Sequence, residues 1–167
     1  MNHPAENKCV MQAAVDAYAI VDTFAEQAYD DLTGTAAETF QSPMGPIAFL
    51  DHDRCWFKSR VGMMGTEAPR AKALCNHLTM LGGEMLVVND ASVDERFRHN
   101  PLVTGDPKIR FYAGAPLVSP SGLVLGAICA IDTEPRQIEQ DQLETLRFLA
   151  QHVIETLKKR RVALGGA

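Results

Sequence analysis

The sequence lacks any apolar segment long enough to cross a membrane. Its longest apolar run extends from Gly122 to Ile131, whereas a membrane-spanning helix needs roughly 20 residues. The N-terminal residues MNHPAENK also lack the basic stretch and apolar core of a secretory signal. We therefore expect a cytoplasmic protein that has no membrane partner.

An excess of positive charge is also absent. The net charge is -5 and the isoelectric point is near 5.5, so no overall field attracts a nucleic acid. The basic run KKRR at 158–161 is local, and basic residues at the end of a predicted helix complement the helix dipole. We expect no nucleic-acid partner.

Closely spaced cysteines are missing as well. The four cysteines, at 9, 55, 75 and 129, form no C-x-x-C pair, and a chain of this size builds a core without disulfides. We interpret them as reduced thiols and leave open a redox role of Cys55, Cys75 or Cys129. Cys75 and His77 lie two residues apart on a predicted helix, so they point about 200° apart and do not converge on a metal.

Familiar catalytic motifs do not occur in the sequence. There is no G-x-S-x-G, no P-loop and no H-E-x-x-H. We therefore predict no catalytic residue and no metal ligand, and the sequence identifies no cofactor.

What the sequence does contain is the composition of one soluble globular domain. Its 167 residues are 46% hydrophobic and 22% charged, with no internal repeat and no low-complexity tract. A chain of this length is sufficient for one substantial core. We expect one domain over residues 1–167.

Hydrophobic periodicity predicts helices at both ends of the chain and strands between them. Apolar residues at steps of four and three begin at Val10, and Thr23 with Glu26 predicts a capping box that starts a second helix, which runs to about Phe40. The remaining predicted elements are a hairpin at 46–61, a helix at 70–81, a strand at 85–88, a polar loop at 91–108, a hairpin at 109–132 and a helix at 141–161. This order favours an α+β fold with a largely antiparallel sheet.

The last predicted hairpin is rich in small residues, which indicates that another element or a small molecule packs closely against it. Alternation along its first strand separates two faces. One face carries Phe111, Ala113, Ala115 and Leu117, and the other carries Arg110, Tyr112, Gly114 and Pro116. The sequence alone leaves open which face borders a pocket.

The segment DASVDERFRHNPLVTGDPKIRFYAGAPLVSPSGLVLGAICAIDTEPR closely resembles the second half of GAF domains, particularly those of bacterial sensor histidine kinases and diguanylate cyclases. The resemblance continues upstream through WFKSRVG and YAIVDT, so it covers nearly the whole chain. It is carried by Asp90, Arg96-Phe97, Asn100-Pro101, residues 110–117, Gly126, Cys129, Asp132 and Pro135-Arg136.

The resemblance implies the GAF fold, in which terminal helices cover one face of a central antiparallel sheet of five or six strands. Loops cover the other face and enclose a pocket. It also implies a division into an N-terminal helix at 1–22, a sheet and pocket core at 23–136 and a C-terminal helix at 137–161. In bilin-binding relatives a histidine directly follows the attachment cysteine, whereas Asn76 follows Cys75 here, so we expect no covalent chromophore.

The predicted ligand lies between the sheet and the loop at 90–108. Arg110 either binds an anionic ligand or pairs with Asp90 or Asp132 to brace this loop, and Trp56 either stacks on a ligand or fills the core. The predicted ligand-binding residues are Trp56, Asp90, Arg96, Phe97, Arg110, Tyr112 and Asp132.

Three functions are compatible with these features. The preferred one is a non-catalytic sensory or regulatory domain that binds an unidentified small molecule or a partner protein. Because no kinase, cyclase or helix-turn-helix module follows the last helix, the domain is expected to act through an output protein such as a kinase or a cyclase, to be an enzyme itself, or to be a piece of a longer protein. The alternatives are a thiol-dependent reductase of free methionine sulfoxide and a dimerisation module with a vestigial pocket.

The terminal helices also predict a homodimer, parallel or antiparallel. Their stripes include Val10, Val21 and Leu157, and each helix has apolar residues outside its main stripe. Such surplus apolar surface is typical of a contact with another chain. The expected contact is a helix-bundle seam.

Overall fold

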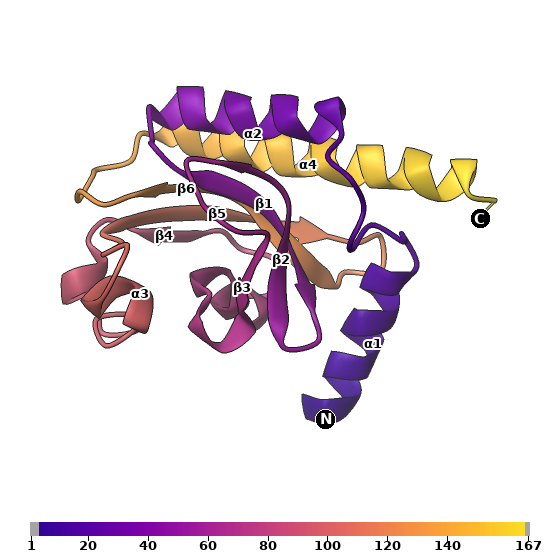
Figure 1. The fold of residues 1–167 in the computed structure, drawn as a ribbon, viewed down its shortest axis with the longest axis horizontal. Coiled ribbons are helices and arrows are strands. Elements are labelled where there is room, and N and C mark those ends of the chain that lie inside the picture. Colours follow the sequence, from indigo (N-terminus) through magenta and orange to yellow (C-terminus); the bar gives the residue numbers. More distant parts are fainter. Residues whose placement is uncertain (1–3, 166–167) are drawn as a thin grey trace.

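A six-stranded antiparallel sheet forms the framework of the structure, a computed structural model that describes residues 4–165 (Figure 1). The strand order is β3-β2-β1-β6-β5-β4. The strands are β1 (Gly45–Asp51), β2 (Arg54–Val61), β3 (Glu67–Pro69), β4 (Leu86–Val88), β5 (Phe111–Val118) and β6 (Val124–Asp132). The predicted α+β class and antiparallel sheet are confirmed.

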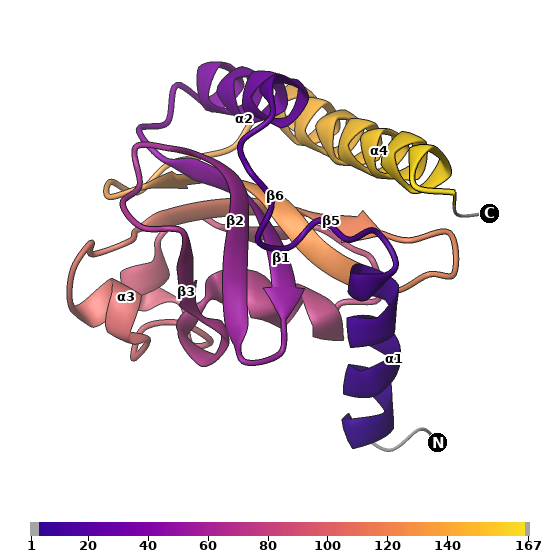
Figure 2. The same cartoon turned by 45° about the vertical axis from the view of Figure 1, so that its right-hand side comes forward.

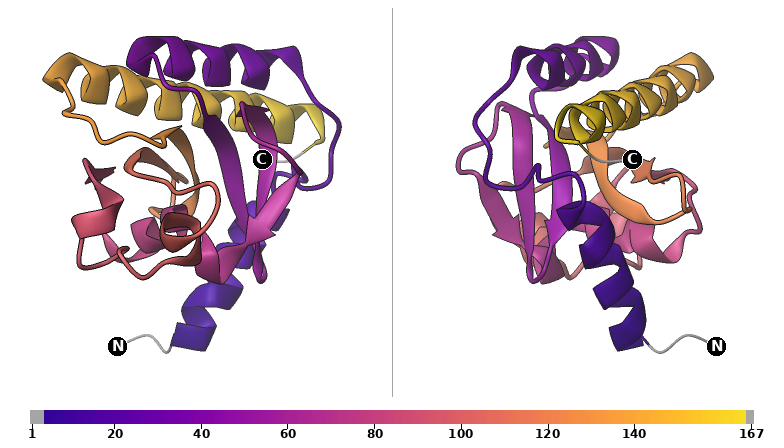
Figure 3. Two further views of the ribbon diagram at one scale, coloured as in Figure 1. Left: turned by 60° about the vertical axis from the view of Figure 1, so that its left-hand side comes forward. Right: turned by 90° about the vertical axis from the view of Figure 1, so that its right-hand side faces the viewer.

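Long helices cover one face of this sheet and short helices cover the other. Helices α2 (Gln27–Phe40) and α4 (Gln140–Ala163) lie side by side on the first face (Figure 2). The opposite face carries the 3-10 helices η1 (Arg70–Lys72), η2 (Leu74–Met80) and η3 (Ala91–Val93) and the short helix α3 (Pro101–Thr104). Helix α1 (Pro4–Asp16) projects away from both layers (Figure 3).

Burial on both faces explains why the central strands are apolar throughout. All nine residues of β6 are buried. On β5, Phe111 and Leu117 belong to the core beneath α2 and α4, whereas Tyr112 belongs to the core on the loop side. The predicted alternation is therefore correct, and it is the Tyr112 face that meets the loops.

Small residues in the last hairpin permit close backbone approach. Strand β6 pairs with β1, and a Cβ atom at Gly126 would overlap the carbonyl oxygen of Ala48. At Gly114 a Cβ atom would collide with the ring of Tyr112, which lies two residues earlier on the same strand. Packing by protein atoms therefore accounts for these glycines without a ligand.

The N-terminal helix is shorter than predicted. It was expected over 1–22, but it ends at Asp16, and the left-handed backbone of Ala19 (φ 49°) and Asp22 (φ 63°) stops any continuation. Residues 1–3 lie outside the described part of the chain. The last helix, expected over 137–161, spans Gln140–Ala163.

The predicted capping box at Thr23 is wrong. The Thr23 hydroxyl donates to the carbonyl oxygen of Ile20 at 2.6 Å, and α2 begins only after Glu26. A true capping box instead starts α4, where Glu139 and Gln142 exchange hydrogen bonds with each other's backbone N–H. The prediction failed because Thr23 lies in an irregular segment that β2 holds.

Two cations of β2 hold that segment against the sheet. Arg54 pairs with Asp22 at 2.8 Å, with Asp51 at 2.8 Å and with Glu67 at 2.7 Å. Lys58, whose side chain is fully buried, pairs with Glu26 immediately before α2. Burial of a lysine is costly unless it is paired, so this contact fixes where α2 begins.

The helix predicted at 70–81 is also different in the structure. It consists of η1 and η2, separated by Ala73, whose backbone is extended (φ -74°, ψ 127°). One extended residue interrupts the helical hydrogen bonds. As a result, Cys75 and His77 lie on a 3-10 turn, and His77 packs edge-on against Phe97.

The stripe on α4 packs onto the sheet and does not form the predicted seam between chains. Leu146, Val153 and Leu157 are fully buried within the chain. A seam that includes Leu157 is therefore incorrect, because the sheet already occupies that side of the helix. Phe148 and Val162 are the large apolar residues of α4 that remain exposed, at 58% and 67%.

Substitution of Gly126 should show how strictly the pairing of β1 with β6 constrains the fold. We expect Gly126→Ala to lower the free energy of unfolding by about 3 kcal/mol, because its methyl group overlaps the backbone of β1. Gly34 in α2 has no atom near its Cβ position, so Gly34→Ala should raise stability by about 1 kcal/mol. Urea unfolding measures both changes, and equal effects of the two substitutions would contradict this account.

Candidate ligand-binding cavity

A small apolar cavity lies on the loop side of the sheet. Its volume is about 60 Å³. Strands β1, β2, β5 and β6 form its floor, and η2 and the loop before β5 contribute to its walls. The lining residues are Pro46, Ala48, Cys55, Phe57, Met63, Ala68, Ala73, Leu74, Cys75, Leu102, Ile109, Tyr112, Cys129 and Ile131.

No charged side chain lines this cavity, and its polar atoms are three thiols and one phenol. The sulfur atoms of Cys55 and Cys75 are 3.1 Å apart. The Tyr112 hydroxyl lies 3.0 Å from the sulfur of Cys129. Each polar atom therefore has its partner within the lining itself.

Burial keeps Tyr112 and Cys129 neutral. It raises the pKa of Tyr112 and of the Cys129 thiol well above their usual ranges. The hydrogen bond with Cys75, together with burial, raises the pKa of Cys55. Because thiolates are the reactive form of cysteine, Cys55 and Cys129 are weakly nucleophilic at neutral pH.

The structure brings one of the seven predicted site residues to the cavity. Tyr112 contributes to its lining. Trp56 lies on the opposite face of the sheet, in the core beneath α2 and α4. Its ring therefore fills the core and lies far from the cavity.

Arg110 braces the loop, but it does so through carbonyl groups. Its guanidinium donates to the carbonyl oxygens of Val103 and Ile109, both at 3.0 Å. The prediction that Arg110 pairs with the carboxylate of Asp90 or Asp132 is therefore wrong. Asp90 instead accepts hydrogen bonds from the backbone and hydroxyl of Ser92 and so caps η3.

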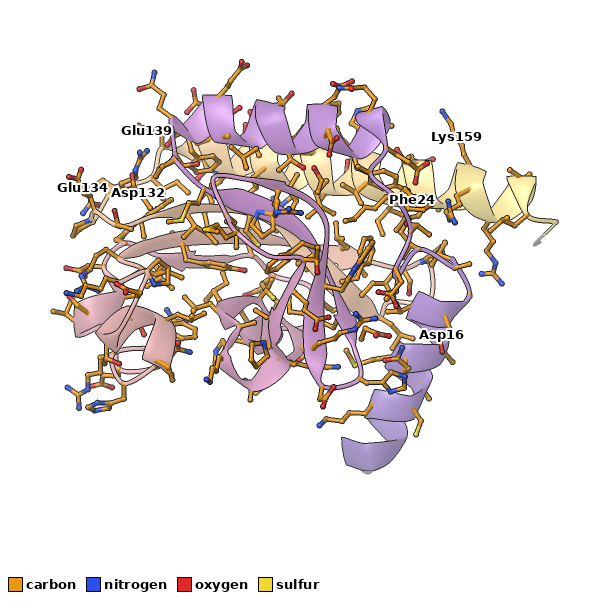
Figure 4. The ribbon with its side chains drawn as sticks, viewed as in Figure 1. Asp16, Phe24, Asp132, Glu134, Glu139 and Lys159 are labelled. Atoms are coloured by element: carbon orange, nitrogen blue, oxygen red, sulfur yellow. The ribbon has the colours of Figure 1, made fainter. Side chains whose placement is uncertain are left out.

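Asp132 has a different cationic partner, Arg136, at 2.6 Å. Arg136 also donates to the carbonyl oxygens of Phe40 and Gln41 at the end of α2. Figure 4 shows Asp132 at the same end of the sheet as Glu134 and Glu139. Asp132 ends β6 and Arg136 lies in the irregular segment before α4, so no helical spacing in the sequence could have revealed this pair.

Arg96 and Phe97 anchor the loop from its outer side. Arg96 pairs with Asp94 at 2.8 Å, and its hydrogen bonds lower the pKa of that carboxyl. Phe97 is buried on the loop side of the sheet. Neither residue lines the cavity.

Convergence of the three thiols was the principal feature that the sequence did not reveal. Cys55 comes from β2, Cys75 from η2 and Cys129 from β6. Their sequence separations carry no local pattern. The available signal was the strand alternation, which places Cys55 and Trp56 on opposite faces.

Two wider grooves lie elsewhere on the surface. One, of about 540 Å³, follows α4 along β5, and the other, of about 760 Å³, separates α1 from the β1–β2 turn and η1. Both include charged side chains. Both grooves are larger than the loop-side cavity and have a more polar lining.

Two features of residues 4–165 bear on the class of site. None of their helices is long and apolar enough to cross a membrane. Within the same residues, no group of three or more His, Cys, Asp or Glu side chains is arranged to hold a metal ion.

Comparison with known proteins identifies the class to which this fold and cavity belong. The family model described as GAF domain matches residues 11–157. The chain therefore belongs to the GAF domain family. A six-stranded sheet with helices on one face and a pocket beneath loops on the other is in agreement with that assignment.

Particular relatives were found by sequence and by structure. A cyclic di-GMP phosphodiesterase of Pseudomonas aeruginosa is 41% identical over 131 residues, which cover 78% of this chain and 22% of the relative. The GAF domain of an Acinetobacter phosphoenolpyruvate-protein phosphotransferase has a TM-score of 0.68 at 14% identity, covering 97% of this chain and 96% of the other.

A second structural neighbour is an enzyme. The free methionine-R-sulfoxide reductase of Neisseria meningitidis, solved in complex with its substrate, has a TM-score of 0.66 at 18% identity. The match covers 92% of this chain and 87% of the reductase. At these identities both structural neighbours show a shared fold.

Proposed function

We propose that residues 1–167 form one cytoplasmic regulatory GAF domain, which binds a small and largely apolar ligand and catalyses no reaction. The observation that carries this proposal is the cavity beneath η2, which has a largely apolar lining without a charged side chain. Burial of a polar or charged ligand there would leave its polar groups unpaired, which is costly. Apolar molecules avoid that cost.

In this proposal the predicted site residues have two roles. Tyr112 contacts the ligand directly, since it lines the cavity. Arg110 fixes the backbone around Ile109, another lining residue, through its bond to that carbonyl. Arg96, Phe97, Asp90 and Asp132 hold the surrounding loop and the strand ends, while Trp56 supports the opposite face.

A thiol-dependent methionine sulfoxide reductase is the second candidate, and the convergence of three thiols favours it. Free methionine sulfoxide, however, carries an ammonium and a carboxylate group. Charged partners are needed to bury such groups, and the cavity offers none. We therefore prefer the non-catalytic function.

The output of this domain is proposed to be an enzyme of cyclic-nucleotide signalling. The similarity to a cyclic di-GMP phosphodiesterase supports such a setting. The chain spans about a fifth of that relative's length, 22%. The regulated unit is then a phosphodiesterase, a cyclase or a kinase, whether in the same polypeptide or in a partner.

We also propose an antiparallel homodimer that forms through the exposed side of α4. Its exposed stripe consists of Glu144, Phe148, Gln151, His152, Glu155 and Lys159. Figure 4 shows Lys159 pointing away from the sheet. A two-fold axis near Gln151 would place Glu144 of one chain opposite Lys159 of its partner, and Phe148 would lie near the centre.

The ligand proposal predicts that an obstructed cavity loses its ligand. Ala73→Leu should lower the amount of any small molecule that co-purifies with the protein by about tenfold. Overpacking of the occupied cavity by the larger side chain needs to cost only about 1.4 kcal/mol for a tenfold loss of affinity. Ala71→Leu is the matched control, since Ala71 is exposed and outside the lining. Mass spectrometry of extracts from the natively purified proteins measures the difference.

Two outcomes would contradict the proposal. One is the absence of a difference in binding, either because both variants retain the same molecule equally or because no small molecule co-purifies with the variants or with the unaltered protein. The other is turnover of free methionine sulfoxide in a thioredoxin-coupled assay that disappears on Cys129→Ser or Cys75→Ser.

The dimer proposal predicts rescue by exchange of charge. Lys159→Glu should weaken dimerisation by about tenfold, because like charges then face one another at the contact, and the double variant Glu144→Lys, Lys159→Glu should restore it. Sedimentation equilibrium measures both constants. A single species near the monomer mass of 18.3 kDa at every concentration would refute the dimer, as would failure of the double variant to recover.

A further inference from the structure

Two thiols meet in the wall of the cavity. For ligand binding alone, a smaller apolar side chain would serve equally well at either position. The sulfur of Cys55 lies 3.1 Å from that of Cys75, and both side chains are buried, at 1% and 6% exposure. A disulfide requires about 2.05 Å between its sulfur atoms. The two sulfur atoms therefore have to move about one ångström closer together to form the bond.

We propose that Cys55 and Cys75 form a reversible disulfide when the cell is exposed to a hydroperoxide. The pair joins two elements that differ in rigidity. Cys55 lies in β2, which is paired on both sides by β1 and β3. Cys75 lies in η2, a 3-10 segment that follows the extended residue Ala73. The approach of the sulfur atoms therefore needs a shift of η2 toward the sheet and no change in strand pairing.

The chemistry begins at Cys75, whose side chain is the more exposed of the two. Its sulfur attacks the hydroperoxide, the O–O bond breaks, and Cys75 becomes a sulfenic acid while the peroxide leaves as an alcohol or, from hydrogen peroxide, as water. The sulfur of Cys55 then attacks the sulfenic sulfur, and the displaced hydroxide takes the thiol proton and leaves as water. Two thiols lose two electrons and the hydroperoxide gains them. A dithiol reductant reverses the step.

The environment makes this a response to strong oxidation only. The hydrogen bond with Cys75 and burial raise the pKa of Cys55, Cys129 adds to this effect, and Arg70 opposes it. Burial also limits the access of a hydroperoxide to both sulfur atoms, so attack is slow. The pair should stay reduced in an ordinary reducing cytoplasm.

The third thiol of the cavity, Cys129, is not part of the proposed disulfide, because it already has a hydrogen-bonding partner. Cys129 Sγ lies 3.0 Å from the Tyr112 hydroxyl, and its side chain is 1% exposed. Cys9, in contrast, is exposed on α1 and could react with other molecules. These differences provide the controls for a test.

The experiment uses the full chain with Cys9→Ser, which retains three thiols. After treatment with excess hydrogen peroxide, we expect one titratable thiol in the denatured protein and a cross-linked pair of peptides containing Cys55 and Cys75. The melting temperature should rise by roughly 5–10 °C, since a bridge across this separation restrains the unfolded chain. Addition of dithiothreitol should reverse both changes.

Further variants in the same background locate the bridge. Cys129→Ser should still form it, whereas Cys75→Ser should not. Three thiols remaining after prolonged oxidation, a bridge that contains Cys129, or conversion of Cys75 to the sulfinic acid without a bridge would each overturn the proposal. Because these measurements do not involve a ligand, they are independent of the proposed binding function.

Discussion

The pairing of β1 with β6 is the contact on which the rest of the structure depends. It joins the hairpin at 45–61 to the hairpin at 111–132, and thus makes one sheet from two halves that are far apart in the sequence. The two backbones approach so closely that Gly126 leaves no space for a side chain. Both cores are built on the sheet that this contact completes.

The two faces of that sheet have different tasks. Beneath α2 and α4 the core is filled by large side chains such as Phe49 and Trp56, and cations of β2 fix the segment that precedes α2. On the loop side, irregular 3-10 helices pack less completely and leave the small cavity. One face therefore carries the core beneath the long helices, and the other carries the cavity and the paired thiols.

Sequence patterns predicted those parts of the structure that local periodicity determines. The alternation of Phe111 with Tyr112 and the apolar stripe that contains Leu146 required only the periods of a strand and a helix. The GAF resemblance supplied the arrangement of the sheet and the side on which the pocket lies. Family membership and fold were therefore predictable before the structure was known.

Features that depend on contacts between distant segments were not predictable in this way. An extended backbone at Ala73 divides a segment whose spacing is helical, and Arg110 finds carbonyl groups where carboxylates were expected. Cys55 and Cys75 meet because η2 packs on the loop side of the sheet, and no periodicity records that contact. Asp90, Arg96 and Arg110 hold the loop, whereas the cavity is built from apolar residues, thiols and Tyr112.

The central claim is that the loop-side cavity is a dry apolar site able to admit a small molecule. Diffraction from crystals of the protein pressurised with xenon tests it most directly, since apolar cavities bind xenon without a polar partner. The account predicts a xenon atom between η2 and β6, in contact with Leu74 and Cys129. Xenon bound only in the groove along α4, or at no position in the protein, would contradict it.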